Sequence, residues 1–161
     1  MTATIPLSQG LVALVDDEDI ERVLALGVWS AFRVGHTAYA QHAMRENGRQ
    51  RNVLLHRVVL DAQPGQEIDH INGNGLDNQK ANLRLVSRSQ NMANQRKTRG
   101  ASRFKGVWWD KVNSRWVAHI RNKGRSYFLG RYVSEEDAAR AYDTAAIETW
   151  GEYARPNFPR P

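Results

Sequence analysis

Residues 56–95 read HRVVLDAQPGQEIDHINGNGLDNQKANLRLVSRSQNMANQ, and this stretch decides the fold of the middle of the chain. Glu67–His70 and Leu83–Val86 are short runs typical of strands, and the Asn- and Gly-rich residues 72–75 between them favour a tight connection. Ser87 then offers an N-cap to a helix that we expect to end near Gln95. The predicted order is strand, loop, strand, helix.

The polar residues of this stretch are of the kinds that cut a phosphodiester bond. Cleavage requires activated water, neutralised phosphate charge and a stabilised leaving oxygen. A neutral imidazole such as His70 can take the proton from water near pH 7. One carboxylate and one amide oxygen, from Asp69 and Asn91, suit Mg²⁺ or Mn²⁺ better than Zn²⁺. These residue types alone leave turn and surface roles open, because Asn-rich loops usually serve turns.

The geometry of Asp69 and His70 sets one condition on such a site. The two residues are neighbours on a predicted strand, so their side chains point to opposite faces unless the strand ends there. An end at the following residues, 71–74, would let both side chains reach one phosphate.

The motifs of residues 56–95 resemble those of HNH endonucleases, specifically the phage and intron-encoded homing type. They are His56-Arg57, Asp69-His70, Asn72-Gly73-Asn74, Leu76-Asp77-Asn78, Asn82-Leu83-Arg84 and Ser89-Gln90-Asn91. The resemblance covers about forty residues with every motif in order, and it implies a ββα-metal nuclease module.

The resemblance also implies a role for each matching residue. His70 corresponds to the general base, Asp69 and Asn91 to the metal ligands, and Asn82 to the asparagine that holds the loop and orients the base. The expected products carry 5′-phosphate and 3′-hydroxyl ends. His56 and Asn78 are left open between structural and phosphate-contacting roles.

Residues 1–55 are expected to form a β-rich N-terminal extension. Short β-like runs at 11–15, 29–33, 37–42 and 53–55 surround one amphipathic stretch at 17–26. Nothing in this part demands chemistry, so we expect a scaffold or a sheet that flanks DNA.

The net charge of +6 is unevenly distributed. The first fifty residues carry 4 Lys/Arg against 6 Asp/Glu, whereas residues 84–131 carry 13 Lys/Arg against one acid, a local net charge of +12. Aromatic residues are interleaved with this basic block, which favours a polyanion partner. An unpaired solubilising surface is the alternative.

The C-terminal part has the pattern of a three-stranded antiparallel sheet packed on one helix. Three β-like runs, at 106–111, 115–121 and 125–132, precede an alanine-rich helix expected at about 134–150. Alternation along the middle run places Arg115, Val117, His119 and Arg121 on one face and the apolar Trp116, Ala118 and Ile120 on the other. We expect the first face to be open to solvent or DNA.

This part resembles the DNA-binding domain of plant ethylene-responsive transcription factors of the Apetala class. The matching elements are Lys105-Gly106-Val107, Trp116-Val117-Ala118, Ile120-Arg121, Leu129-Gly130, the helix EEDAARAYDTAA and Asn157-Phe158. The resemblance implies that the following residues face DNA: Lys105, Trp108, Arg115, His119, Arg121, Arg125 and Tyr127. His119 stands where the family has glutamate and Trp108 where it has arginine, so the target sequence is not carried over. Such domains also occur fused to HNH modules in homing endonucleases.

The expected architecture is α+β, with an N-terminal β-rich extension at 1–55, an HNH nuclease module at 56–95, a basic linker at 96–102 and the DNA reader at 103–161. The predicted function is that of a homing endonuclease, which binds duplex DNA sequence-specifically and nicks it or cuts both strands in a reaction that depends on a divalent metal. The alternatives are a non-enzymatic DNA-binding regulator with a decayed nuclease module and an RNA-binding protein that stacks bases on aromatic rings. Retention of Asp69, His70, Asn82 and Asn91 together argues against decay.

Composition narrows the remaining possibilities. The chain has no cysteine, which excludes disulfides and thiolate zinc sites. It has no apolar run of membrane-spanning length, and its first residues lack the pattern of a secretory signal, so we expect a cytoplasmic protein of a bacterial or phage-infected cell. Double-stranded DNA is the expected partner, with no obligate protein partner. We expect a monomer or weak dimer, and a monomer with one active site would nick.

Overall fold

The computed structural model describes residues 1–46, 48–95 and 100–160. The chain divides into two compact units, Met1–Val86 and Ser87–Pro161, and each is described by itself. Residues 96–99 of the predicted basic linker lie outside the described residues. The predicted α+β class is confirmed, since antiparallel sheets and helices occur in both units.

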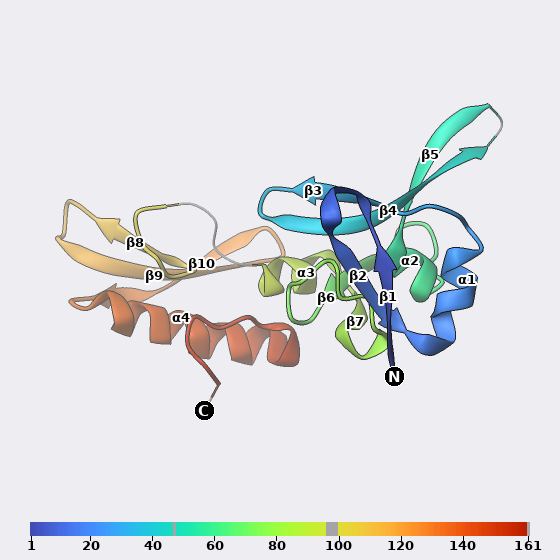
Figure 1. Ribbon diagram of the computed structural model, residues 1–161. Helices are drawn as coiled ribbons and strands as arrows, with labels where there is room; N and C mark the ends of the chain where they lie inside the picture. The colour runs from blue at the N-terminus through green and yellow to red at the C-terminus, as the bar shows by residue number, and fades with distance from the viewer. Residues whose placement is uncertain (47, 96–99, 161) are drawn as a thin grey trace. The chain divides into compact units, whose positions relative to one another are not determined.

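The first unit is built from small antiparallel sheets (Figure 1). β1 (Thr2–Pro6) pairs with β2 (Val12–Asp16), and β6 (Glu67–His70) pairs with β7 (Leu83–Val86). A further sheet has the order β3 (Ser30–Val34), β4 (Thr37–Glu46) and β5 (Arg49–Leu54). The helical segments are short: η1 (Ser8–Gly10), η2 (Asp17–Asp19), α1 (Ile20–Leu24), α2 (Leu55–Val59) and η3 (Lys80–Asn82).

The predicted strands at Glu67–His70 and Leu83–Val86 are confirmed to the residue. One strand and one α-helix of this unit, β1 and α2, were not predicted. β1 does alternate, with Ala3 partly buried and Ile5 buried between exposed residues, but the run is only five residues long and ends at Pro6. In α2 the pair Val58-Val59 is β-branched and favours strand locally, while packing in the core selects the helix.

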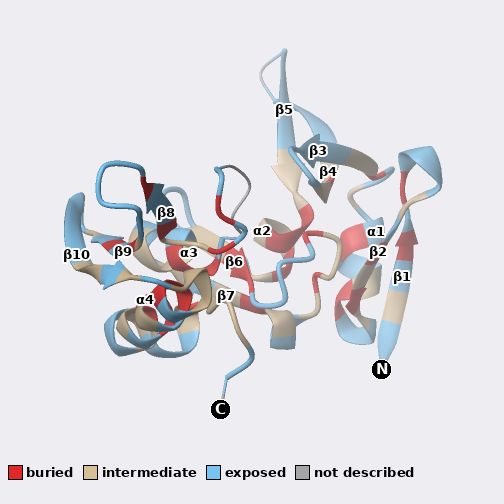
Figure 2. Ribbon diagram, turned by 90° about the vertical axis from the view of Figure 1, so that its left-hand side faces the viewer, coloured by how far each residue is buried: buried red, intermediate tan, exposed pale blue. Residues whose placement is uncertain are grey.

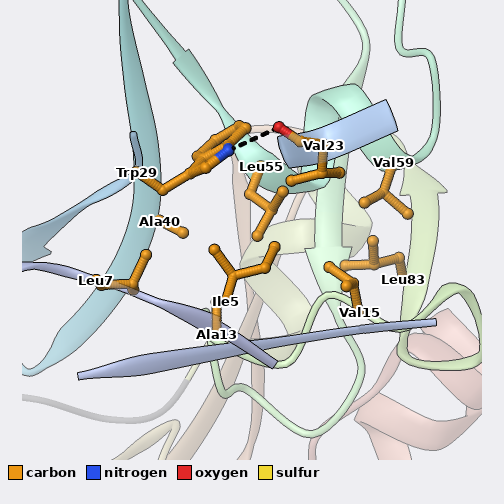
Figure 3. Close-up of a cluster of buried hydrophobic side chains, with 10 residues drawn as sticks. All are labelled: Ile5, Leu7, Ala13, Val15, Val23, Trp29, Ala40, Leu55, Val59 and Leu83. Atoms are coloured by element: carbon orange, nitrogen blue, oxygen red, sulfur yellow. Dashed lines mark hydrogen bonds between the residues drawn. The ribbon is translucent and has the colours of Figure 1, made fainter. Parts of the chain in front are cut away.

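One hydrophobic core joins the N-terminal residues to the segment that follows them. Ile5, Leu7, Ala13, Val15, Val23, Trp29 and Ala40 pack with Leu55, Val59 and Leu83 (Figure 3). Trp29 lies in this core with its indole N–H satisfied, because Nε1 donates to the carbonyl oxygen of Val23 at 3.0 Å. Residues 1–55 are therefore structurally continuous with residues 56–86.

The second unit contains α3 (Arg88–Asn94) and a sheet of order β10 (Arg125–Tyr132), β9 (Arg115–Asn122), β8 (Val107–Asp110). The long helix α4 (Glu135–Trp150) and the turn η4 (Gly151–Tyr153) follow. Ser134 caps α4, since its side chain accepts from the backbone N–H of Asp137. The predicted three strands followed by one helix are confirmed.

Small residues let α4 approach the sheet. Ala138, Ala139 and Ala146 are buried against residues of the sheet, together with Tyr142. Gly106 has a φ of +75°, and a Cβ there would lie 1.9 Å from the Tyr142 ring. Glycine is therefore required at this contact.

The open face of this sheet differs from the prediction at Val117. Val117 is only 2% exposed, although it was expected on the solvent face with Arg115, His119 and Arg121. In register it lies between Trp108 on β8 and Arg131 on β10. Cross-strand neighbours share a face, so these two large side chains flank the valine.

Candidate functional site

Strand β6 ends in two buried polar residues, Asp69 and His70, which are 7% and 6% exposed (Figure 2). The strand ends at His70, as the predicted site requires, and the chain turns immediately, with the N–H of Gly73 donating to the His70 carbonyl at 2.8 Å. The loop that follows, residues 71–79, is called the site loop below.

Asn82 fastens the site loop. Its Oδ1 accepts from the backbone N–H of Asn72 at 3.0 Å, and its Nδ2 donates to the Asn72 Oδ1 at 3.1 Å and to the Asp77 carbonyl at 2.8 Å. The Asn82 carbonyl also accepts from the N–H of Ile71. One side chain therefore bridges both ends of the loop, an arrangement compatible with its predicted role.

Asn78 contacts His70 directly. The Nε2 atom of His70 lies 3.3 Å from the Oδ1 of Asn78, and Asn78 is fully buried. The sequence left its role open, because no periodicity or spacing predicts that a loop residue eight positions later returns to the histidine. An imidazole that donates from Nε2 carries its lone pair on Nδ1.

Two aromatic rings, those of His56 and Tyr39, lie close to His70. The His56 ring lies 5.1 Å from the His70 ring, centroid to centroid, and Tyr39 on β4 lies 6.0 Å from His56 and 5.9 Å from His70. Burial lowers the pKa of His70, opposed by the Asn78 contact and by the carboxylates of Asp69 and Asp77. Burial, with the charges of His70 and Arg57, lowers the pKa of His56 to about 3. Both rings are therefore favoured in their neutral form near neutral pH.

Arg84 on β7 pairs with Asp69 across the two-stranded sheet. Its Nε and Nη2 donate to the Asp69 Oδ2 at 3.0 Å and 2.8 Å, and both side chains are largely buried. In register the two residues are directly opposite. The sequence did not predict this pair, although Arg84 lies in the motif Asn82-Leu83-Arg84.

The two predicted metal ligands are of the types that a hard divalent cation prefers. Asp69 offers a carboxylate and Asn91 an amide oxygen, the ligand types that Mg²⁺ and Mn²⁺ prefer. Among the residues that the structure describes, no group of three His, Cys, Asp or Glu side chains is placed to hold a metal ion. A cation here would therefore depend on amide, water or phosphate oxygens beside the one carboxylate.

The N-terminal sheet supports the site loop from behind. The N–H of Leu14 donates to the Leu76 carbonyl, and the N–H of Asn78 donates to the Leu14 carbonyl, both at 2.8 Å. Gly75 allows a close approach to β4, because a Cβ there would lie 2.5 Å from the Ala38 carbonyl oxygen. These contacts hold Asn78, and hence its amide, at a fixed position beneath His70.

Asn91, the other predicted metal ligand, belongs to the second unit. It lies on α3, half-buried, on a helix that begins with the predicted Ser87 cap. That cap is a full capping box, with reciprocal bonds between Ser87 and Gln90. Asp69, His70 and Asn82 lie in the first unit.

The seven predicted DNA-facing residues do not share one face of the sheet. Arg115, His119 and Arg121 on β9 are exposed on the face that also carries Trp108. Arg125 pairs with Asn122, and Tyr127 with the buried Ile120, so the register places both on the opposite face.

Phe128 takes the place on the open face that was expected for Tyr127. It pairs with His119 and is 61% exposed. The register shifts between Phe128 and Gly130, and this bulge reverses the alternation along β10. Gly130, with a φ of +141°, was the signal in the sequence that could have located it.

Lys105 faces α3. Its Nζ donates to the carbonyl oxygens of Met92, Ala93 and Gln95 at the end of that helix. Burial and the charge of Arg155, opposed by Asp143, lower its pKa to about 8. The side chain predicted to meet DNA is thus engaged in a helix-end contact.

Comparison with known proteins agrees with the two resemblances. Residues 53–93 match the family model described as HNH endonuclease, and residues 102–152 match the AP2 domain. An uncharacterized HNH endonuclease of Acanthamoeba polyphaga mimivirus is 36% identical over 110 residues, 67% of this chain and 57% of that protein. None of the helices in the described residues is long and apolar enough to cross a membrane.

Plant proteins match the second unit. An AP2-like ethylene-responsive transcription factor of Arabidopsis thaliana is 48% identical over 63 residues, 39% of this chain and 20% of the plant protein. An AP2/ERF and B3 domain-containing protein of Oryza sativa subsp. japonica is 35% identical over 120 residues, 74% of this chain and 30% of that protein. The chain spans a third or less of these plant relatives and little more than half of the viral one. It carries an HNH endonuclease domain followed by an AP2 domain.

Proposed function

We propose that this protein is a divalent-metal-dependent endonuclease that binds duplex DNA through its AP2 domain and hydrolyses phosphodiester bonds with its HNH domain. The observation that supports this most is a buried, neutral-favoured His70 at the end of β6, beside Asp69 and above a loop fastened by Asn82. A small domain has no structural need for two buried histidines beside a carboxylate.

In this proposal His70 takes the proton from the attacking water. Asn78 holds its Nε2, so that the Nδ1 lone pair is the base. Asp69 and Asn91 would hold Mg²⁺ or Mn²⁺, which when bound neutralises phosphate charge and stabilises the leaving oxygen. Asn82 keeps the loop, and therefore the histidine, in register.

The AP2 domain would supply affinity and sequence preference. Its open face carries Arg115, His119 and Arg121, with Trp108 and Phe128 beside them. Arginine reads guanine edges in the major groove, and aromatic rings pack on thymine methyl groups or sugars. A homing role, with cleavage at few sites in a bacterial or phage genome, belongs to the same proposal.

Cleavage of supercoiled plasmid tests the enzyme. We expect nicking with Mg²⁺ or Mn²⁺ that EDTA abolishes and that His70→Ala loses by at least about a hundredfold, the usual contribution of a general base. His36→Ala, at an exposed histidine, is the matched control and should cut normally. Undiminished cutting by His70→Ala would refute the assignment of the base.

Two further results would favour the alternatives. If the protein binds one DNA sequence tightly but cleaves no DNA with any divalent metal, it is a DNA-binding regulator. Preference for single-stranded RNA over duplex DNA across a salt titration would indicate an RNA-binding protein.

A further inference from the structure

Helix α3 carries the predicted metal ligand Asn91, yet it packs within the same compact unit as the AP2 domain. The family model for the HNH domain ends at residue 93, and that for the AP2 domain begins at residue 102. The last helix of the nuclease motif is therefore structurally part of the reader.

Residues of the reader hydrogen-bond to α3 near both of its ends. At its C-terminal end the ammonium of Lys105 donates to the carbonyls of Met92, Ala93 and Gln95, and the backbone N–H of Arg155 donates to Ala93 at 3.3 Å. The last carbonyls of a helix have no partner inside it, so these bonds fix where the helix ends.

Near the N-terminal end, Ser89 forms a bridge to two elements of the reader. The indole Nε1 of Trp150, the last residue of α4, donates to the Ser89 Oγ at 3.2 Å. Ser89 Oγ in turn donates to the Oδ1 of Asn122, at the end of β9, at 3.1 Å. Asn122 directly follows Arg121, which is predicted to contact DNA. The burial of Ala93 and Asn94 on the same helix is consistent with tight packing.

We propose that the AP2 domain positions the metal ligand Asn91, with Lys105, Ser89 and Trp150 as the positioning residues. This inference rests on the proposed function, since it takes Asn91 as a ligand. Neither Lys105 nor Trp150 would touch metal or DNA in this role. Asn91 lies two residues from Ser89 and one from Met92, between the two points at which the helix is held.

Mn²⁺ binding to the full-length protein without DNA tests the inference. The dissociation constant would be measured from the free Mn²⁺ signal in electron paramagnetic resonance. We expect Lys105→Met and Ser89→Ala each to raise it about tenfold, as residues that orient metal ligands do. Ser89→Thr keeps the hydroxyl and should restore near-normal binding. Lys111→Met, at an exposed lysine of the same domain, is the matched control.

Hydrogen exchange of the backbone amides provides a second readout. We expect the amides of α3 to exchange faster in Lys105→Met and in Ser89→Ala, while those of β8, β9 and β10 keep their protection. This pattern separates loss of positioning from unfolding. Where Lys105→Met fails to fold, Ser89→Ala and Trp150→Phe carry the test.

Two results would overturn the inference, and they are distinguishable. Unchanged Mn²⁺ affinity in Lys105→Met and Ser89→Ala, together with weakened binding in Asp69→Asn, would refute the positioning role and leave the proposed nuclease standing. Mn²⁺ binding that is insensitive to both Asp69→Asn and Asn91→Ala would refute the proposed metal site itself, and the inference with it.

Discussion

The Nε2 atom of His70 lies 3.3 Å from the Oδ1 of the fully buried Asn78, which connects the candidate base to the loop behind it. The backbone of Asn78 is in turn fixed by Leu14 on β2. The orientation of the candidate base therefore depends on a strand that is more than fifty residues away in the sequence.

Asn78→Asp should move the pH dependence of cleavage. A general base works only when neutral, so the acidic limb of the rate profile follows its pKa. Burial lowers the pKa of His70, and a carboxylate at position 78 would raise it by favouring the imidazolium. We expect the acidic limb to move up by about one pH unit, measured by plasmid nicking between about pH 5 and 8.5.

Asn74→Asp adds the same charge at an exposed position of the same loop and serves as the control. The shift should be absent or much smaller there. Equal shifts in the two variants would mean that loop charge alone, and not the Asn78 contact, tunes the histidine.

The His56 ring should make the protein sensitive to acid. Its pKa is about 3 in the folded chain, against 6.5 for an unperturbed histidine. Between these values the unfolded chain binds a proton that the folded chain does not, so the free energy of unfolding falls as pH falls. From pH 6.5 to 4.5 this single group should cost about 2 kcal/mol.

His56→Phe keeps an aromatic ring beside Tyr39 and removes the titration. The free energy of unfolding is measured by urea titration at pH 6.5 and at pH 4.5. We expect the fall between these pH values to be about 2 kcal/mol smaller in His56→Phe than in the wild type. His36→Phe, at an exposed turn position, should retain the wild-type acid sensitivity. An identical pH response in His56→Phe and wild type would contradict the buried neutral ring.

The pair Asp69–Arg84 should stabilise the first unit. Arg84→Met removes both donors from the Asp69 Oδ2 and leaves a largely buried carboxylate without them. Breaking a buried pair on one side typically costs about 3–5 kcal/mol, and we expect a loss near the lower end. The double variant Asp69→Asn/Arg84→Met should lose less unfolding free energy than Arg84→Met alone, because it leaves no buried carboxylate without its arginine.

Urea denaturation measures this cycle, with Arg45→Met on the exposed part of β4 as the control. A double variant that is no more stable than Arg84→Met would show that the pair contributes through packing and not through charge.

Local signals predicted most of the secondary structure. β6, β7 and the Ser87 cap were found because their runs are short, bounded by turn residues and self-contained in the sequence. The same holds for β10 and the capped helix α4. Residues at or next to the ends of each of these elements, such as turn residues and N-caps, mark where it begins and ends.

Contacts between distant residues could not be predicted in the same way. The Asn78–His70 bond depends on the path of a loop, and the support from Leu14 depends on a sheet that pairs elsewhere. Lys105 was expected to face DNA because it matches a motif residue of the Apetala-class domain, and that resemblance gave no sign that its ammonium would donate to carbonyls at the end of α3. Such a contact depends on how α3 packs, which no local pattern predicts.

The bulge in β10 leads to a final prediction about DNA recognition. Arg121 is exposed on the open face of the sheet, whereas the register places Arg125, only four residues later, on the opposite face. If the open face reads bases, Arg121→Ala should lose about 1–3 kcal/mol of discrimination between the selected DNA site and random duplex. Arg125→Ala removes the same charge and should weaken binding to the selected site and to random duplex equally.

Competition binding of each variant at two salt concentrations measures this difference. Loss of a phosphate contact lowers the affinity for DNA without changing the preference for one sequence. A loss of preference in Arg125→Ala with none in Arg121→Ala would mean that DNA is read by the face of the sheet that carries Tyr127.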